Sequence, residues 1–251
     1  MGRMVAIVPA GGVGARAIAP DFTSSAAFST KVAAVPKQYH LIAGVPMIRR
    51  SVLALLADSR IDQVIVAIQP GDMWAEAVLS DLPRVSLKAC AGATRALTVL
   101  GALHTLSPEM NLWVLVHDAA RPGLTRDALA RLIDTCLPHP VGGLLALPAA
   151  DTLKQSQPDI TQPSQTDIPL VRKTLKRDDV WLAQTPQMFQ ASVLKTALQG
   201  ALDAGFDVTD EASAMEWAGH APLLVRGSVT NAKVTWPEDF EWVGSWLSTQ
   251  K

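Results

Sequence analysis

Residues 5–16 read VAIVPAGGVGAR, an apolar run followed by a turn of small residues and an arginine. The run Val5–Pro9 is short and rich in β-branched residues, which predicts a buried strand. Glycines after such a strand let backbone N–H groups approach a polyphosphate closely, and these donors suit anionic oxygens. A glycine turn alone is as often structural, but the cation directly after it, Arg16, favours a bound anion. We therefore predict a nucleotide-binding turn formed by Ala10, Gly11, Gly12 and Gly14.

The chain beyond this turn alternates apolar runs with segments of helical spacing. Near-continuous apolar strands separated by helices indicate a parallel sheet covered on both faces. We predict an α/β fold, Rossmann-like, with a mostly parallel twisted sheet in one domain over residues 1–251. The expected strands are 5–9, 64–68, 84–88, 112–116, 143–147, 180–183 and 222–226. The expected helices are 47–57, 73–79, 95–106, 126–137, 191–202, 210–218 and one that starts near Pro237.

Two stretches break this alternation. Residues 151–179 are rich in Gln, Pro, Thr, Lys and Asp and have little apolar periodicity, so they cannot bury much surface on their own. We predict an arm or hairpin that leaves the main sheet there. Residues 17–36 are rich in Ala, Ser and Thr. We interpret them as a mobile loop that closes over a bound nucleotide, because loops of that length in compact domains are usually lids or disordered.

Composition narrows the class of protein. The formal charge of −1 lacks the basic excess of a nucleic-acid-binding surface, so we expect no nucleic-acid partner. The apolar N-terminal run is too short for a signal peptide, and no run approaches the about 20 apolar residues of a membrane helix. Cys90 and Cys136 lack metal-ligand spacing and are expected to be buried thiols. We predict a cytoplasmic enzyme that does not bind a membrane.

A second candidate cation stands in the segment Pro36–Tyr39, which reads Pro-Lys-Gln-Tyr. A single lysine is usually solvated surface. Lys37, however, follows a proline that fixes the local backbone and a loop that can fold over a nucleotide. Together, Arg16 and Lys37 can neutralise the charge that builds on a pentavalent α-phosphate, which is electrostatic stabilisation of a transition state. We predict that both are catalytic.

The strand expected at residues 112–116 runs into the sequence His-Asp-Ala-Ala-Arg-Pro. A carboxylate at a strand's carboxyl end, opposite a triphosphate, suits Mg²⁺, so Asp118 is the predicted metal ligand. The small side chain of Ala119 leaves room for the nucleotide's sugar, and Arg121 supplies a fork for a second phosphate. The alternative for Asp118 is a residue that only caps the next turn. We expect His117 to be a packed, hydrogen-bonded core residue rather than a base.

Five segments in this order resemble the 2-C-methyl-D-erythritol 4-phosphate cytidylyltransferases of the non-mevalonate isoprenoid pathway. They are the glycine turn with Arg16, Pro36–Tyr39, Val116–Pro122, Thr209–Ser213 and Asn231–Thr235. The resemblance runs from about Val5 to Phe240. It implies a nucleotidyltransferase fold and the transfer of CMP from CTP to a sugar-alcohol phosphate, 2-C-methyl-D-erythritol 4-phosphate, with Mg²⁺ as cofactor.

The resemblance also implies roles for single residues. Lys233 and Arg177 would position the sugar phosphate for attack, and Arg121, Thr152 and Thr209 would lie near the acceptor. Arg177 falls within the polar excursion, and the family uses such an arm to reach a neighbouring subunit's site; the alternative for Arg177 is a solvated cluster of charges. A homodimer with exchanged arms is therefore implied, which agrees with a polar arm that needs a partner surface to order it.

The segment Ala89–Val99 matches the family's base-reading segment in part. Gly92 and Arg95 match, Ala91 replaces a glycine, and Thr98 replaces a serine while keeping its hydroxyl. The resemblance thus implies nucleotide binding by Gly92, Arg95 and Thr98.

Two other functions stay open. A cytidylyltransferase for ribitol 5-phosphate shares the glycine turn, the lysine and the aspartate, and differs only around the acceptor. A non-catalytic, nucleotide-binding regulatory protein would keep the fold but lose the reactive positions. Those positions are all filled here, which favours catalysis; they are Arg16, Lys37, Asp118 and Lys233.

Overall fold

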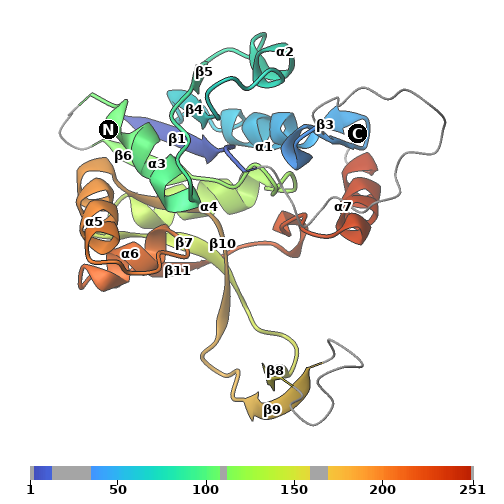
Figure 1. The fold of residues 1–251 in the computed structure, drawn as a ribbon, viewed down its shortest axis with the longest axis vertical. Coiled ribbons are helices and arrows are strands. Elements are labelled where there is room, and N and C mark those ends of the chain that lie inside the picture. Colours follow the sequence, from blue (N-terminus) through green and yellow to red (C-terminus); the bar gives the residue numbers. More distant parts are fainter. Residues whose placement is uncertain (1–2, 13–34, 108–111, 159–168, 250–251) are drawn as a thin grey trace.

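The computed structural model describes residues 3–12, 35–107, 112–158 and 169–249 (Figure 1). Its centre is a seven-stranded sheet in the order β11-β7-β10-β6-β1-β4-β5. Neighbouring strands are parallel except for β10, which is antiparallel to both β6 and β7. The strands are β1 (Met4–Pro9), β4 (Gln63–Ala67), β5 (Val85–Lys88), β6 (Trp113–Val116), β7 (Gly142–Pro148), β10 (Trp181–Gln190) and β11 (Leu223–Arg226). The predicted mostly parallel sheet is confirmed.

Helices cover both faces of this sheet, as predicted (Figure 1). Because side chains alternate along a strand, Ala6 and Val8 of β1 pack in one hydrophobic core, whereas Val5 and Ile7 pack in the other. The first core lies against α1 (Met47–Leu56), α2 (Ala75–Leu79) and α4 (Arg126–Cys136). The second lies against α3 (Arg95–His104), α5 (Ala191–Asp203) and α6 (Glu211–Trp217). Cys136 is buried as expected, but Cys90 is only half-buried.

The strand β10 is longer than the predicted range 180–183. Its register shifts between Ala183 and Gln187, so the strand continues beyond an irregular segment to Gln190. That segment contains Pro186, a residue that sheets accept mainly at edges and bulges. The polar residues of the bulge have the sequence character of a loop, which is why the second half of the strand was not predicted.

The predicted excursion begins after β7. The strands β8 (Leu153–Gln157) and β9 (Leu170–Leu175) form an antiparallel two-stranded hairpin that stands away from the body (Figure 1). Every residue of β9 is exposed. Most of the other irregular stretch, residues 17–36, lies outside the described residues. Its closure over a nucleotide therefore stays a prediction. The division into a single domain also stays a prediction.

Capping residues fix the N-terminal ends of two helices, as expected. Thr125 caps α4, since its hydroxyl accepts a hydrogen bond from the backbone N–H of Ala128. The last helix, α7 (Pro237–Ser248), begins at Pro237, and Asp239 in its first turn accepts hydrogen bonds from the N–H groups of Thr235 and Trp236. This second cap anchors the segment that precedes α7.

The remaining elements are short and were not predicted. They are η2 (Lys37–Tyr39), β2 (Leu41–Ile42), β3 (Val45–Pro46) and η3 (Val229–Asn231). Ile42 of β2 and Val234, which follows η3, join a small third core beneath α7. Among the described helices, none combines the length and apolar character that crossing a membrane requires.

The glycine turn lies in close contact with the segment after β5. A Cβ atom built on Gly11 would lie 2.4 Å from the Cβ of Ala91, a distance that real Cβ atoms do not reach. A Cβ atom on Gly12 would meet no described atom within 4 Å. Gly11 is therefore required by the presence of Ala91, at the position where the resembled family has a glycine.

This contact predicts a compensating pair of substitutions. Gly11→Ala should lower the free energy of unfolding by about 1–3 kcal/mol, because the added methyl group overpacks the contact. The double variant Gly11→Ala/Ala91→Gly should recover most of that loss, and Gly12→Ala serves as the matched control with little effect. Urea unfolding measures all three variants. A double variant no more stable than Gly11→Ala would show that the two residues do not constrain each other.

Candidate active site

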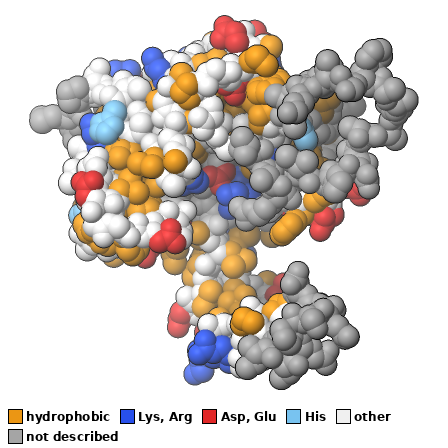
Figure 2. Space-filling model, in the orientation of Figure 1, with side chains coloured by type: hydrophobic (Ala, Val, Ile, Leu, Met, Phe, Trp, Pro, Cys, Tyr) orange, Lys and Arg blue, Asp and Glu red, His pale blue; other side chains and the backbone are white. Residues whose placement is uncertain are grey.

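A cleft of about 620 Å³ opens at the carboxyl ends of the parallel strands β6, β1, β4 and β5. Ligands of open α/β folds bind at this edge of the sheet. Figure 2 shows acidic and basic side chains side by side near the middle of this face of the body, above the root of the arm. The predicted nucleotide-binding residues that line the cleft are Ala10, Gly11, Gly12, Gly92, Arg95, Thr98 and Ala119. Gly14 lies outside the described residues.

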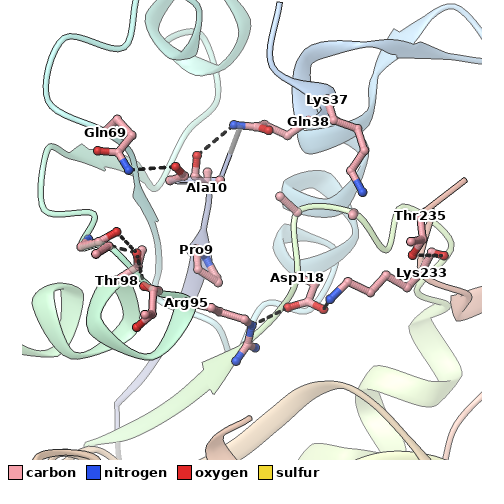
Figure 3. A pocket seen from close by; sticks show the side chains of 17 residues that line it. Pro9, Ala10, Lys37, Gln38, Gln69, Arg95, Thr98, Asp118, Lys233 and Thr235 are labelled. Atoms are coloured by element: carbon pink, nitrogen blue, oxygen red, sulfur yellow. Dashed lines mark hydrogen bonds and ion pairs between the residues drawn. The ribbon is translucent and has the colours of Figure 1, made fainter. Parts of the chain in front are cut away.

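The predicted reactive side chains meet in the same cleft. Lys37, Asp118 and Lys233 all line it, although they are far apart in the sequence (Figure 3). The Nζ of Lys37 donates a hydrogen bond to the carbonyl of Val234 at 2.6 Å, which places the amine beside the Lys233 segment. Lys37 is thus a partly buried cleft residue rather than solvated surface. Arg16 lies outside the described residues.

Two glutamines that the sequence analysis did not single out hold the glycine turn. The Nε2 of Gln38 donates to the carbonyl of Ala10 at 2.9 Å, and the Nε2 of Gln69 donates to the carbonyl of Gly11 at 2.8 Å (Figure 3). Gln38 is buried. Both glutamines line the cleft, so they hold the backbone of the turn from the side that faces the cleft. Gln38 stands in the Pro-Lys-Gln-Tyr segment, which is the only sequence signal that pointed to it.

Asp118 is a buried carboxylate surrounded by cations. Its Oδ1 accepts a hydrogen bond from the Nε of Arg95 at 2.9 Å. Its Oδ2 lies 2.9 Å from the Nζ of Lys233 and 3.6 Å from the Nε of Arg121. Burial alone would raise the pKa of Asp118, but the charges of Arg95, Lys233 and Arg121 outweigh it and hold this pKa well below its usual range. The carboxylate is therefore ionised at neutral pH.

Lys233 is held in place by its neighbour. Val234 is fully buried in the third core, and its N–H donates to the carbonyl of Ala120 at 2.8 Å. The backbone of the 231–235 segment is thereby fixed beside the end of β6. The Lys233 side chain itself remains 45% exposed, so its ammonium group reaches Asp118 from the solvent side.

Arg95 joins Asp118 to a second carboxylate. Its two Nη atoms donate to the two carboxylate oxygens of Glu211, at 2.7 and 3.0 Å. Glu211 is fully buried, and burial raises its pKa against the opposing charge of Arg95. Glu211 lies within the Thr209–Ser213 motif, but no role was predicted for it. The guanidinium of Arg95 is thus committed to two acids, and its contact with a nucleotide stays a prediction.

His117 is a core residue, as expected. It is fully buried, and burial lowers its pKa to about 4, so the ring is neutral. Its Nε2 lies 3.1 Å from the carbonyl of Arg121, which can only accept, so Nε2 carries the proton. Its Nδ1 then accepts from the hydroxyl of Thr185, and that hydroxyl accepts from the N–H of Asp118. This chain of hydrogen bonds ties the end of β6 to the bulge of β10.

Arg121 does not line the cleft. Its side chain is mostly buried, and its Nη atoms donate to the carbonyls of Asn231 at 2.7 Å and Ala183 at 3.3 Å. Arg121 therefore fastens the segment after β6 to the start of the β10 bulge and to the segment that carries Lys233. Its predicted role as a fork for a second phosphate stays a prediction.

Three predicted acceptor residues lie away from the cleft of their own chain. Thr152 and Arg177 stand at the base of the arm, and Thr209 precedes α6; all three are exposed. The guanidinium of Arg177 donates to the carbonyl of Ala150. The fold of one chain therefore does not bring Arg177 together with Lys233 in the lining of the cleft.

The donor set in the cleft suits a metal ion that arrives with its ligand. Asp118 is the single carboxylate among the described lining residues, and the described part of the chain holds no group of three or more metal-ligating side chains. Mg²⁺ is commonly held by one or two carboxylates together with substrate phosphates. The residues present fit that arrangement and do not fit a metal ion held by protein alone.

Comparisons with known proteins identify the family of the chain. A family model described as 2-C-methyl-D-erythritol 4-phosphate cytidylyltransferase matches residues 4–248. The enzymes of that name from Bordetella petrii and Bordetella pertussis are 56% and 53% identical over 244 residues, which is 97% of this chain and 98% of each relative.

Solved structures give the same result. A crystal structure of a 4-diphosphocytidyl-2C-methyl-D-erythritol synthase is 33% identical with a TM-score of 0.78, covering 98% of this chain and 99% of its own. The Francisella tularensis 2-C-methyl-D-erythritol 4-phosphate cytidylyltransferase is 31% identical with a TM-score of 0.74, covering 97% of this chain and 99% of its own. With its cleft, its motifs and these relatives, the chain belongs to the 2-C-methyl-D-erythritol 4-phosphate cytidylyltransferase family.

Proposed function

We propose that the cleft around Asp118 is where this cytidylyltransferase moves a CMP group from CTP to 2-C-methyl-D-erythritol 4-phosphate. The products are 4-diphosphocytidyl-2-C-methyl-D-erythritol and pyrophosphate, in isoprenoid precursor biosynthesis. One observation carries the proposal for the site: Lys37, Asp118 and Lys233 converge on the same cleft as the glycine turn. We further propose that the enzyme works in the cytoplasm.

The cytosine base would lie against the segment that carries Thr98. The hydroxyl of Thr98 donates to the carbonyl of Thr94 at 2.9 Å and accepts from the N–H of Gly92 at 3.1 Å. Its proton is therefore in use, and a lone pair remains. A lone pair suits the amino group of cytosine, whereas the corresponding oxygen of uracil would be repelled. This supports CTP over UTP as the donor.

The chemistry needs cations more than a base. The phosphate oxygen of the acceptor is already a nucleophile at neutral pH. It attacks the α-phosphorus of CTP in line, a new P–O bond forms, and the bond to the β-phosphate breaks to release pyrophosphate. Lys37 and Arg16 would neutralise the charge that builds at the α-phosphate, and Lys233 would hold the acceptor's phosphate. His117 takes no part, because it is buried, neutral and engaged at both nitrogens.

Mg²⁺ is the proposed cofactor. Asp118 would hold it together with phosphate oxygens of CTP, and when bound it would neutralise charge on those phosphates. The low pKa of Asp118 supports this role, since the carboxylate is ionised throughout the physiological pH range. Oδ2 of Asp118, which Lys233 contacts, would be the oxygen that holds the ion.

The acceptor side of the cleft would be completed by a second chain. The arm exposes large apolar side chains, among them Leu170, Val171 and Leu175, and Figure 2 shows hydrophobic surface on it. Exposed apolar side chains gathered on one element mark an interaction surface. We propose a homodimer with exchanged arms, in which Arg177 and Thr152 of one chain reach the other chain's cleft.

A pyrophosphate-release assay tests the function directly. The purified chain is mixed with CTP, Mg²⁺ and either 2-C-methyl-D-erythritol 4-phosphate or ribitol 5-phosphate. We expect turnover with the first acceptor and little with the second. Turnover with ribitol 5-phosphate alone would overturn the proposed acceptor, and binding of CTP without turnover on either acceptor would indicate a regulatory protein.

The role of Lys37 predicts a specific kinetic defect. Lys37→Ala should lower kcat by about 10²–10³-fold, because it removes charge stabilisation of the transition state. The affinity for CTP should change much less. Lys195→Ala, on α5 and outside the cleft lining, is the control and should keep normal turnover. Near-normal kcat in Lys37→Ala would remove this residue from the chemistry.

Arm exchange predicts that two inactive variants restore each other. Lys37→Ala and Arg177→Ala should each be nearly inactive alone. A mixed dimer would have one cleft with both defects and one with neither, so unfolding and refolding an equal mixture should recover about a quarter of wild-type activity. A mixture of Lys37→Ala and Lys233→Ala is the control and should recover none, since both residues line one chain's cleft. No recovery in the first mixture would mean that Arg177 does not act on a partner's cleft.

A further inference from the structure

Glu211 is a buried carboxylate to which the reaction described above gives no role. It is 0% exposed and is the first residue of α6. Among the described residues, Arg95 is the basic side chain that it contacts, through both Nη atoms. A buried carboxylate is costly unless it is paired, so the Glu211–Arg95 contact is a fixed feature of the fold.

The position of Glu211 is set independently of the cleft. Asp210 caps α6 by accepting from the N–H of Ser213 at 2.9 Å, and Ser213 completes a capping box. Gln187 of β10 ties this turn to the sheet: its Nε2 donates to Asp210, and its Oε1 accepts from the N–H of Ala212, both at 2.8 Å. The start of α6, which carries Glu211, is therefore anchored to β10, the strand next to β6. The position of the Glu211 carboxylate then determines where the guanidinium of Arg95 lies.

This anchoring decides how Arg95 meets Asp118. Because both Nη atoms face Glu211, only Nε is directed at Asp118, where it takes one oxygen, Oδ1. The other oxygen, Oδ2, faces the Nζ of Lys233 at 2.9 Å (Figure 3) and, more distantly, the Nε of Arg121 at 3.6 Å. Without Glu211, the guanidinium would be free to turn its fork onto both oxygens of Asp118, the geometry that Arg–carboxylate pairs commonly adopt.

Glu211 also balances charge. Arg95, Arg121 and Lys233 all lie within 4 Å of Asp118, so three cations face one carboxylate. A site with that excess of positive charge repels a divalent cation, and in a partly desolvated cleft such repulsion is weakly screened. The charge of Glu211 offsets that of Arg95, so three cations face two carboxylates and the excess positive charge of the cluster is halved.

We propose that Glu211 is a positioning residue, which balances and orients Arg95 so that Oδ2 of Asp118 stays clear of the Arg95 fork. A divalent metal ion arriving with the nucleotide can then take this oxygen over from the exposed Lys233. This inference rests on the proposed role of Asp118 as a metal ligand. It assigns a function to the acidic residue of the Thr209–Ser213 segment.

The test is calorimetric binding of CTP to the full chain, without acceptor, in Mg²⁺ and in EDTA. The readout is the dissociation constant of CTP in EDTA divided by that in Mg²⁺. This ratio measures how much the metal ion strengthens the binding of CTP. In Glu211→Gln this ratio should fall by about tenfold, because a residue behind a metal ligand has been neutralised. In EDTA, CTP should bind as well as to wild type or more tightly, since the cleft gains positive charge. A purely structural role would instead weaken CTP binding in both conditions.

A second variant keeps the test decisive. In Glu211→Gln/Arg95→Met no buried charge is left unpaired, so the double variant should fold and its ratio should return towards the wild-type value, even where CTP binds more weakly overall. Three results would each overturn the inference. The ratio could be unchanged in Glu211→Gln, it could stay as low in the double variant as in Glu211→Gln, or it could be near one in the wild type. Wild-type pyrophosphate release is measured separately, so failure of the proposed reaction is distinguishable from failure of this inference.

Discussion

The site depends on the ion pairing of one carboxylate, that of Asp118. It joins three distant segments, because Arg95 opens α3, Arg121 follows β6, and Lys233 precedes α7. Removing one member of a buried ion cluster typically costs about 3–5 kcal/mol, since the remaining charge is left uncompensated. The segments are therefore held together before a ligand enters. Fixed charges that need no rearrangement are what stabilises a charged transition state most effectively.

The bulge of β10 supplies the polar framework behind this cluster. Thr185 accepts from the N–H of Asp118 and donates to His117, and its carbonyl accepts from the Nδ2 of Asn231 at 2.7 Å. Gln184 donates to the carbonyl of Ser228 at 2.9 Å. The segment that carries Lys233 is thus bonded to the antiparallel strand and not only to its own helix. An irregular strand in the middle of a parallel sheet places the second lysine of the site.

The sequence predicted what depends on local patterns and missed what depends on distant partners. Apolar runs located six of the seven strands of the central sheet closely, and residue chemistry at a strand end pointed to Asp118. The proline and the loop that precede Lys37 pointed to that residue. The roles of Gln69 and Glu211 were not predicted, because their partners, Gly11 and Arg95, lie 58 and 116 residues away in the sequence. Amides and carboxylates carry no sequence signal of their own when a distant contact defines their role. The second half of β10 escaped because its polar bulge has the composition of a loop.

The three cations around Asp118 differ in how freely they can move, and that difference organises the site. The Arg121 side chain is 11% exposed and bonded to two carbonyls, and Arg95 is 27% exposed and held by Glu211. Lys233 is 45% exposed, and a lysine stem is flexible with a compact charge at its tip. A ligand that competes for Oδ2 of Asp118 therefore displaces Lys233 while the two arginines stay. In the proposed reaction, the lysine released in this way would remain at the rim of the cleft and meet the incoming phosphate of the acceptor, so that filling one half of the site would prepare the other.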